Sequence, residues 1–157
     1  MKRERIRFHK SIRLPRECYS EPNRPFFITI CVVNKFQLFS NTKIAERMWE
    51  LIIKGHLMTH SDLICACLMP DHLHLIQVPT KENLIDLIGR WKSYTTTIMK
   101  KEFQVRSLWQ RGFYDHAVRK EEDLRELVDY TINNPVRAGL VESAKEYPYS
   151  WHRWMQS

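Results

Sequence analysis

Two histidines, His72 and His74, stand one residue apart in the apolar segment LMPDHLHLIQV at 68–78. Successive side chains of a β-strand point to opposite faces, so both imidazoles would share one face, about 7 Å apart along the strand. Leu73 and Leu75 would then point to the other face. Imidazole is the commonest metal-ligand side chain and also a general acid or base. The pair therefore predicts a site for one metal ion or one phosphate. The structural alternative is two half-exposed histidines that each find a hydrogen bond.

Three classes of enzyme use such a pair. Histidine-triad hydrolases need a third histidine two residues further on, where this chain has Ile76. Two-histidine phosphoesterases need two separate His-x-Ser/Thr motifs, and the chain does not have two. The remaining class is the HUH nucleases, in which the pair holds a divalent metal ion on a DNA phosphate. In these enzymes a tyrosine on a nearby helix attacks the phosphorus.

The nuclease interpretation requires a suitable tyrosine, and Tyr130 lies in the predicted last helix at 121–134. Asn134 follows four residues later, so both side chains would lie on one helical face. Two imidazoles and one amide oxygen would form a three-ligand site for Mg²⁺ or Mn²⁺ with open positions. Taken singly, Tyr130 could equally pack at the helix edge, and Asn134 could end the helix before Pro135.

The segments that must position these residues follow the order β-α-β-β-α-β and then a helix. Strands are predicted at 25–33, 63–69, 72–78 and 112–118, and helices at 41–58, from residue 83 and at 121–134. The pattern is typical of an α+β ferredoxin-like fold, with a four-stranded antiparallel sheet, helices on one face and an additional C-terminal helix that carries Tyr130. Tyr94 is expected to pack beside Trp91 on the apolar stripe of its helix. The aromatic tail at about 143–157 is expected to pack irregularly.

The charge of the chain points to a polyanion partner. Lys and Arg number 25 against 18 Asp and Glu, a formal net charge of +7. Much of the excess lies in an N-terminal arm at about 1–24, which includes Arg3, Arg5 and Arg7. A basic cluster of this kind is typical of nucleic-acid binding. A charged arm that only keeps the protein soluble explains the composition equally well.

The length of 157 residues suits a single domain at 1–157. The N-terminus lacks the apolar core of a secretory signal, and no apolar run is long enough to span a bilayer, so a cytoplasmic location without a membrane partner is expected. The four cysteines are expected to be reduced there and to act as small buried hydrophobic residues. One alternative is a small zinc protein whose ligands are Cys65, Cys67, His72 and His74, although their spacing is unusual for zinc.

The sequence resembles the REP-associated tyrosine transposases, relatives of the IS200/IS605 transposases with one catalytic tyrosine within the HUH superfamily. The resemblance is carried by LMPDHLHLI, SLWQRGFYDHAVR, VDYTINNPVRAGLV and YPYSWHRW, which occur in the order of the family and span residues 68–154. The strand PFFITICVVN near the start also fits. Four separate motifs therefore agree on one family.

The resemblance implies that His72 and His74 are the metal-binding pair, that Tyr130 is the catalytic tyrosine and that Asn134 is the third metal ligand. It also implies a divalent metal cofactor, Mg²⁺ or Mn²⁺, and single-stranded or hairpin DNA from REP-like palindromes as the partner. Relatives in insertion sequences are dimers, but the longer C-terminal tail of the REP-associated branch favours a monomer over a homodimer. The segment with Trp109, Gln110, Arg111 and His116 is expected near DNA, together with the arginines of the arm.

A second class of function is a single-stranded nucleic-acid binding domain without catalysis, because RNA-recognition domains have the same sheet. Such domains present aromatic side chains on their central strands. Here the corresponding outward positions carry His72, His74 and Ile76, which favours catalysis over binding alone.

Overall fold

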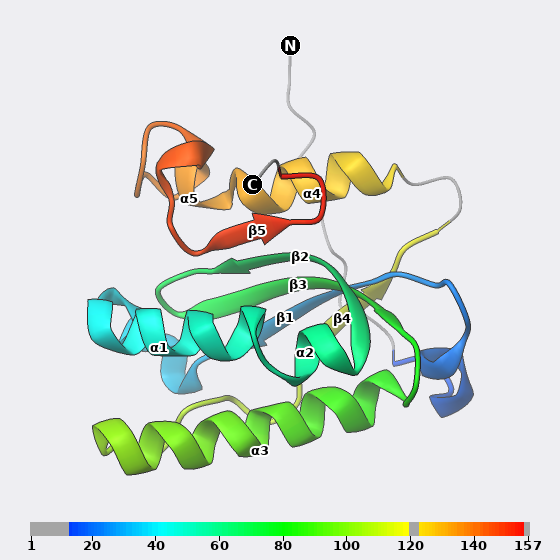
Figure 1. The fold of residues 1–157 in the computed structure, drawn as a ribbon, viewed down its shortest axis with the longest axis horizontal. Helices are drawn as coiled ribbons and strands as arrows, with labels where there is room; N and C mark the ends of the chain where they lie inside the picture. The colour runs from blue at the N-terminus through cyan, green and yellow to red at the C-terminus, as the bar shows by residue number, and fades with distance from the viewer. Residues whose placement is uncertain (1–12, 120–122, 156–157) are drawn as a thin grey trace.

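The structure is a computed structural model that describes residues 13–119 and 123–155. Its centre is one antiparallel sheet of five strands in the order β4-β1-β3-β2-β5 (Figure 1). The strands are β1 (Phe26–Cys31), β2 (Ser61–Leu68), β3 (His72–Pro79), β4 (Tyr114–Ala117) and β5 (Ser150–His152). The first four keep the strand order of the ferredoxin-like fold, which confirms the predicted class.

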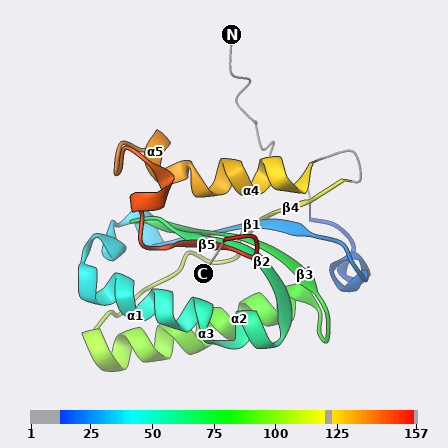
Figure 2. The ribbon, with the colours of Figure 1, turned by 45° about the horizontal axis from the view of Figure 1, so that its top comes forward.

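Helices lie on both sides of the sheet (Figure 2). The α-helices are α1 (Thr42–Ile53), α2 (His56–Thr59), α3 (Leu84–Phe103), α4 (Leu124–Ile132) and α5 (Asn134–Arg137). Short 3-10 helices are η1 (Arg16–Ser20), η2 (Val33–Lys35), η3 (Leu38–Ser40) and η4 (Ala144–Glu146). Helices α1, α2 and α3 cover one face, and α4 covers the opposite face (Figures 1 and 2).

Two apolar clusters follow from this layering. Leu73 and Leu75 of β3 belong to the larger cluster, with Met48 of α1 and Trp91 of α3. The smaller cluster joins the other face of the sheet to α4, through Phe27, Ile76, Leu127, Val128 and their neighbours. The predicted orientation of Leu73 and Leu75 toward the main helix layer is therefore correct. His72 and His74 alternate with these leucines along β3, so they face the opposite side, toward α4.

The predicted helix at 41–58 is divided into α1 and α2 at Gly55. The backbone of Gly55 is extended, with φ −101° and ψ −160°. A Cβ atom at this position would lie 2.3 Å from the carbonyl oxygen of Leu51, so only glycine allows so close an approach. The helix therefore ends here, and α2 turns back under the sheet toward β2.

The tail is more regular than expected. Residues Ser150–His152 form β5, which pairs antiparallel with β2 from Cys65 to Cys67. The hydroxyl group of Tyr147 donates to the carbonyl oxygen of Leu68, and Arg153 forms an ion pair with Asp62. The expectation of irregular packing was wrong, because three consecutive residues find hydrogen-bonding partners on an otherwise open edge strand.

The described part of the basic arm is anchored to the sheet. Arg13 forms an ion pair with the buried Asp115 at 2.8 Å, and the hydroxyl group of Tyr19 donates to the same carboxylate at 2.8 Å. Burial of the phenol, followed by its bond to Asp115, raises the pKa of Tyr19. Arg3, Arg5 and Arg7 lie outside the described residues, so their predicted role in binding DNA is not tested by the structure.

The last predicted helix also differs from expectation at Pro135. We expected this proline to stop a helix that reaches Asn134. Instead α4 ends at Ile132, and Pro135 stands in the first turn of a separate short helix, α5. Proline is tolerated there because the first turn leaves its backbone nitrogen without an intrahelical partner in any case. Asn134 is consequently the first residue of α5 rather than the last of α4.

Candidate functional site

The site is built on the face of the sheet that lies under α4. On this face the register places Thr29 of β1 and Cys67 of β2 on either side of His74. His72 stands one step along, opposite Cys31. Both histidines are half-buried, so they are reachable from solvent while being held by the sheet.

The two imidazole rings converge. Their Nε2 atoms are 3.0 Å apart, and the ring centroids are 4.5 Å apart. Each Nδ1 atom has a separate partner: that of His72 lies 2.5 Å from Oδ1 of Asp71, and that of His74 lies 2.9 Å from Oγ1 of Thr29. An ionised carboxylate only accepts hydrogen bonds, so Nδ1 of His72 carries a proton and donates to Asp71. In the neutral ring this leaves a lone pair on Nε2.

The protonation state of His74 suits a metal ligand. Burial of the ring, followed by the electrostatic effects of His72 and Arg137, lowers the pKa of His74 to about 3. His74 is therefore neutral at physiological pH, and a neutral imidazole is the form that binds metal ions. Contacts such as those of Asp71 and Thr29 orient ligating histidines in metal sites.

The alternative zinc site is not assembled. Cys67 stands opposite His74, but Cys65 stands opposite Ile76, one step further from the histidine pair. Burial raises the pKa of both thiols, that of Cys67 to about 12. In the part of the chain that the structure describes, no group of three or more His, Cys, Asp and Glu side chains is arranged to hold a metal ion. The expected third ligand, Asn134, would bind through an amide oxygen and is not one of these four residue types.

Tyr130 and Asn134 come from the segment that covers this face. Tyr130 is the seventh residue of α4 and is half-buried. The guanidinium group of Arg137 lies 3.9 Å from the centre of the Tyr130 ring, and its Nη2 donates to the Tyr130 carbonyl oxygen at 2.6 Å. Arg137 therefore holds Tyr130 through both its ring and its backbone.

Asn134 lies between these residues in the sequence and is half-buried. Its backbone carbonyl oxygen accepts a bond from the nitrogen of Ala138 at 2.9 Å. Within residues 13–119 and 123–155, its side-chain amide has no hydrogen-bonding partner. The amide oxygen is thus free of competing hydrogen bonds within the described structure.

The segment expected near DNA is divided between the two faces. Trp109 packs on the α3 side: its Nε1 donates to Thr95 Oγ1 at 2.9 Å, and its ring lies against Trp91 and Phe39. Gln110 bonds through its backbone to Cys31 and accepts from Lys92, while Arg111 is exposed. His116 stands opposite Phe27 on β4 and thus shares the face of His74. Trp109 therefore packs within the fold, whereas Arg111 is exposed and His116 is half-buried on the face of the histidine pair.

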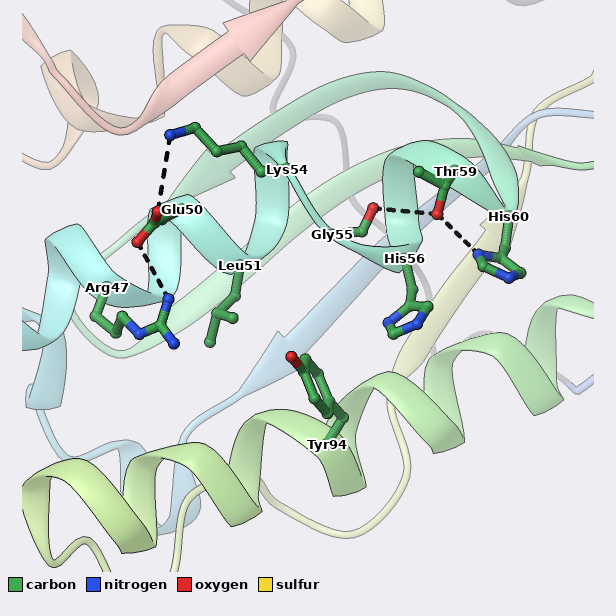
Figure 3. A pocket seen from close by; sticks show the side chains of 9 residues that line it. All are labelled: Arg47, Glu50, Leu51, Lys54, Gly55, His56, Thr59, His60 and Tyr94. Carbon is green, nitrogen blue, oxygen red and sulfur yellow. Dashed lines mark hydrogen bonds and ion pairs between the residues drawn. The ribbon is translucent and has the colours of Figure 1, made fainter.

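Tyr94 is the tyrosine whose environment was predicted wrongly. It is 44% exposed rather than packed on the stripe of α3, because Thr95 and Met99 take the buried positions. Its ring meets His56 edge-on at 5.4 Å in a cleft of about 360 Å³ between α1, α2 and α3 (Figure 3). Arg47 and Lys54 in this cleft are already paired with Glu50. The cleft lies in the helix layer on the opposite side of the sheet from His72 and His74.

Three residues of the site were missed from sequence. Asp71 stands directly before His72, and this position is a sequence signal that could have identified it. Thr29 becomes a neighbour of His74 only through the register of β1 and β3. Arg137 stands two helical turns after Tyr130, a spacing that would have suggested one face had the helix been taken past Pro135.

Comparison with known proteins agrees with this architecture. The family model described as "Transposase IS200 like" matches residues 25–134. The chain belongs to this family. The matched region contains the histidine pair, Tyr130 and Asn134.

Individual relatives are consistent with the family. A REP-associated tyrosine transposase of Escherichia coli is 34% identical over 134 residues, which cover 82% of this chain and 76% of the relative. A Haemophilus influenzae protein to which the same name is given provisionally is 34% identical over 105 residues. That alignment covers 59% of this chain and 60% of the relative's length.

Among solved structures, a REP-associated tyrosine transposase bound to a REP hairpin superimposes with a TM-score of 0.69 at 25% identity. The match covers 84% of this chain and 78% of the other. This match confirms the α+β fold and agrees with the assignment of the chain to the IS200-like transposase family. In the described part of the chain, no helix has the length and apolar character needed to cross a membrane.

Proposed function

We propose that this protein is a metal-dependent DNA strand transferase that cleaves single-stranded or hairpin DNA through a 5′-phosphotyrosine on Tyr130. His72, His74 and Asn134 would hold Mg²⁺ or Mn²⁺. The hairpin substrate is proposed because a structurally similar transposase has been solved with a REP hairpin. We also propose a monomer rather than a homodimer, because the longer C-terminal tail of the REP-associated branch favours a monomer.

One observation carries the proposal: the two Nε2 atoms are 3.0 Å apart, with both Nδ1 atoms held by other groups. Two ring nitrogens at this separation would be able to hold one divalent ion together. The amide oxygen of Asn134 would add a hard oxygen ligand of the kind that suits Mg²⁺ and Mn²⁺.

The chemistry follows from the side chains. A free phenol has a pKa of about 10 and is a weak nucleophile at neutral pH. A bound divalent ion would supply the missing activation by withdrawing charge from the scissile phosphate. Tyr130 attacks the phosphorus: the new bond joins its phenolic oxygen to the 5′ phosphate, and the bond to the 3′ oxygen breaks. The phenol loses its proton, and the leaving oxygen becomes a 3′-OH.

The covalent link conserves the energy of the phosphodiester. A second 3′-OH can therefore attack the phosphotyrosine and rejoin strands without ATP. One tyrosine suffices for cleavage followed by strand transfer. Phosphate contacts from basic side chains would make binding steeply dependent on salt.

The test is a covalent adduct. Hairpin oligonucleotides with randomised flanks carry a dye at the 3′ end, because the protein remains on the fragment that keeps this end. With Mn²⁺ the wild-type protein should give a labelled band that survives SDS, and Tyr130→Phe should give none. Tyr94→Phe is the matched control, since this exposed tyrosine lies in the opposite layer.

Two outcomes would count against the proposal in different ways. An adduct that persists in Tyr130→Phe and disappears in Tyr94→Phe would show that the tyrosine is wrongly assigned. Hairpin binding without any adduct from the wild-type protein would favour the alternative, a nucleic-acid binding domain without catalysis.

A further inference from the structure

Arg137, the last residue of α5, makes two contacts with a single residue of α4. Its Nη2 atom donates to the carbonyl oxygen of Tyr130 at 2.6 Å, and its guanidinium carbon lies 3.9 Å from the centre of the Tyr130 ring. A cation over the face of an aromatic ring is attracted by the ring's quadrupole. The backbone bond and the stacking together restrict where the phenol of Tyr130 can point.

Among the described residues, Arg137 forms no ion pair with any Asp or Glu side chain. By contrast, Arg13, Arg16, Arg24, Arg47, Arg90 and Arg153 each pair with a carboxylate. Arg137 is exposed but is held against Tyr130 by the stacking contact and the backbone bond. A fixed cation without a carboxylate partner is a position where a bound anion would be stabilised.

Tyr130 belongs to the helix that lies over the sheet face of the histidine pair (Figures 1 and 2). Leu127 and Val128 of α4 share one apolar cluster with Ile76, which follows His74 by two residues on the same face of β3. The guanidinium group of Arg137 is therefore stacked on a residue of the helix that covers this face.

We propose that Arg137 binds the scissile phosphodiester and holds it between the phenol of Tyr130 and the histidine pair. This inference rests on the proposed strand-transfer function and adds a catalytic residue to it. A guanidinium group has five N–H donors, and the bond to the Tyr130 carbonyl group uses one of them. The remaining donors form a planar fork that matches two phosphate oxygens.

The same contact would act during the reaction as well as in binding. Negative charge on the non-bridging oxygens must be stabilised while the phenolic oxygen attacks and the 3′ oxygen leaves. A donor that is already fixed by Tyr130 needs no reorganisation at that moment. Lysine cannot replace it fully, because an ammonium group is a point charge that cannot both stack on the ring and bind two oxygens.

The experiment compares single-turnover rates of adduct formation at saturating hairpin and Mn²⁺ for wild type, Arg137→Ala and Arg137→Lys. The matched control is Arg125→Ala, since Arg125 is a second arginine of this helical segment stacked on an exposed aromatic ring, that of Trp154 at 4.9 Å. Both Arg137 variants should be slower by about 100-fold or more, the usual effect of removing one fixed donor to developing charge. Arg125→Ala should stay within about threefold of wild type, because it removes no such donor.

Two further readouts separate a chemical role from a structural one. Millimolar guanidinium ion should restore part of the rate of Arg137→Ala and leave Arg125→Ala unchanged. The melting temperature and the Mn²⁺ affinity of Arg137→Lys should match those of the wild type, because lysine keeps the charge and the apolar stem. If Arg137→Ala unfolds, the inference can still be tested with Arg137→Lys.

The inference is overturned if Arg137→Lys reacts at the wild-type rate, or if guanidinium ion fails to accelerate a folded Arg137→Ala protein. It is also overturned if only hairpin affinity falls while the rate at saturation is unchanged. A wild-type protein that forms no adduct would instead overturn the proposed function, so the two failures can be distinguished.

Discussion

Replacement of Asp71 by asparagine tests whether the histidine pair is organised as a metal site. The carboxylate of Asp71 accepts a hydrogen bond from Nδ1 of His72 at 2.5 Å and thereby fixes the ring with its Nε2 lone pair toward His74. Asparagine has the same shape but no charge, and its amide can also present N–H groups that fit the other tautomer. Asp71→Asn should therefore weaken metal binding without altering the fold.

The magnitude follows from the contact. Loss of a partner that orients a ligating histidine costs about 10- to 100-fold in metal affinity. The side chain of Asp71 is 28% exposed, so solvent screens part of its charge, and the lower part of this range is expected. We predict a decrease of about 10- to 30-fold, which corresponds to about 1.4–2 kcal/mol. Thr29→Val removes a neutral hydrogen bond of 2.9 Å to His74 and should cost less, about 0.5–1.5 kcal/mol.

The assay is titration with Mn²⁺, followed by calorimetry or by the electron paramagnetic resonance signal of the free ion. The control is Asp62→Asn, because Asp62 lies at the far end of β2 and pairs with Arg153. An Asp71→Asn protein that binds Mn²⁺ as tightly as the wild type, with an unchanged melting temperature, would refute the proposed role of Asp71. A larger effect for Thr29→Val than for Asp71→Asn would refute the ranking.

Three more predictions concern the structure around the site. Leu127→Ala removes a buried contact between α4 and the sheet and should lower the free energy of unfolding in urea by about 2–4 kcal/mol. The control is the exposed Leu140, since Leu140→Ala should change the free energy of unfolding by less than about 0.5 kcal/mol. Because burial raises the pKa of Cys67 to about 12, this thiol stays protonated at pH 8 and should not react with a disulfide reagent in the native protein, as mass spectrometry would show; labelling as fast as that of the half-exposed Cys31 would contradict the packing. Asn83→Ala removes the cap of α3, in which the Asn83 side chain accepts from a backbone nitrogen at 2.9 Å, and should cost about 1 kcal/mol in the same unfolding measurement; no measurable change would show that the cap contributes nothing.

Features that depend on local geometry were predicted well from the sequence. The alternation of side chains along a strand put His72 and His74 on one face and Leu73 and Leu75 on the other. The apolar spacing predicted the helix from residue 83, which is α3, and the order of the elements predicted the ferredoxin-like sheet. In these cases neighbouring residues determine the outcome, since a strand or helix has a fixed repeat.

The errors occurred where more than one residue or segment could have taken the same place in the fold. The stripe of α3 permits either Tyr94 or Thr95 to be buried, and Thr95 is buried because its hydroxyl group finds partners in Trp91 and Trp109. The tail forms β5 only because the edge of β2 is free to pair with it. No periodic pattern in the tail sequence indicates that the edge of β2 is free to pair.

The sequence by itself determined the histidine pair, its common face and the candidate tyrosine. Only the tertiary structure decided that Thr29 borders His74, that α4 covers this face and that Arg137 joins Tyr130 to the site. The physical reason is that strand register and helix docking are set by the burial of whole apolar surfaces, so they bring together residues that have no relation along the chain.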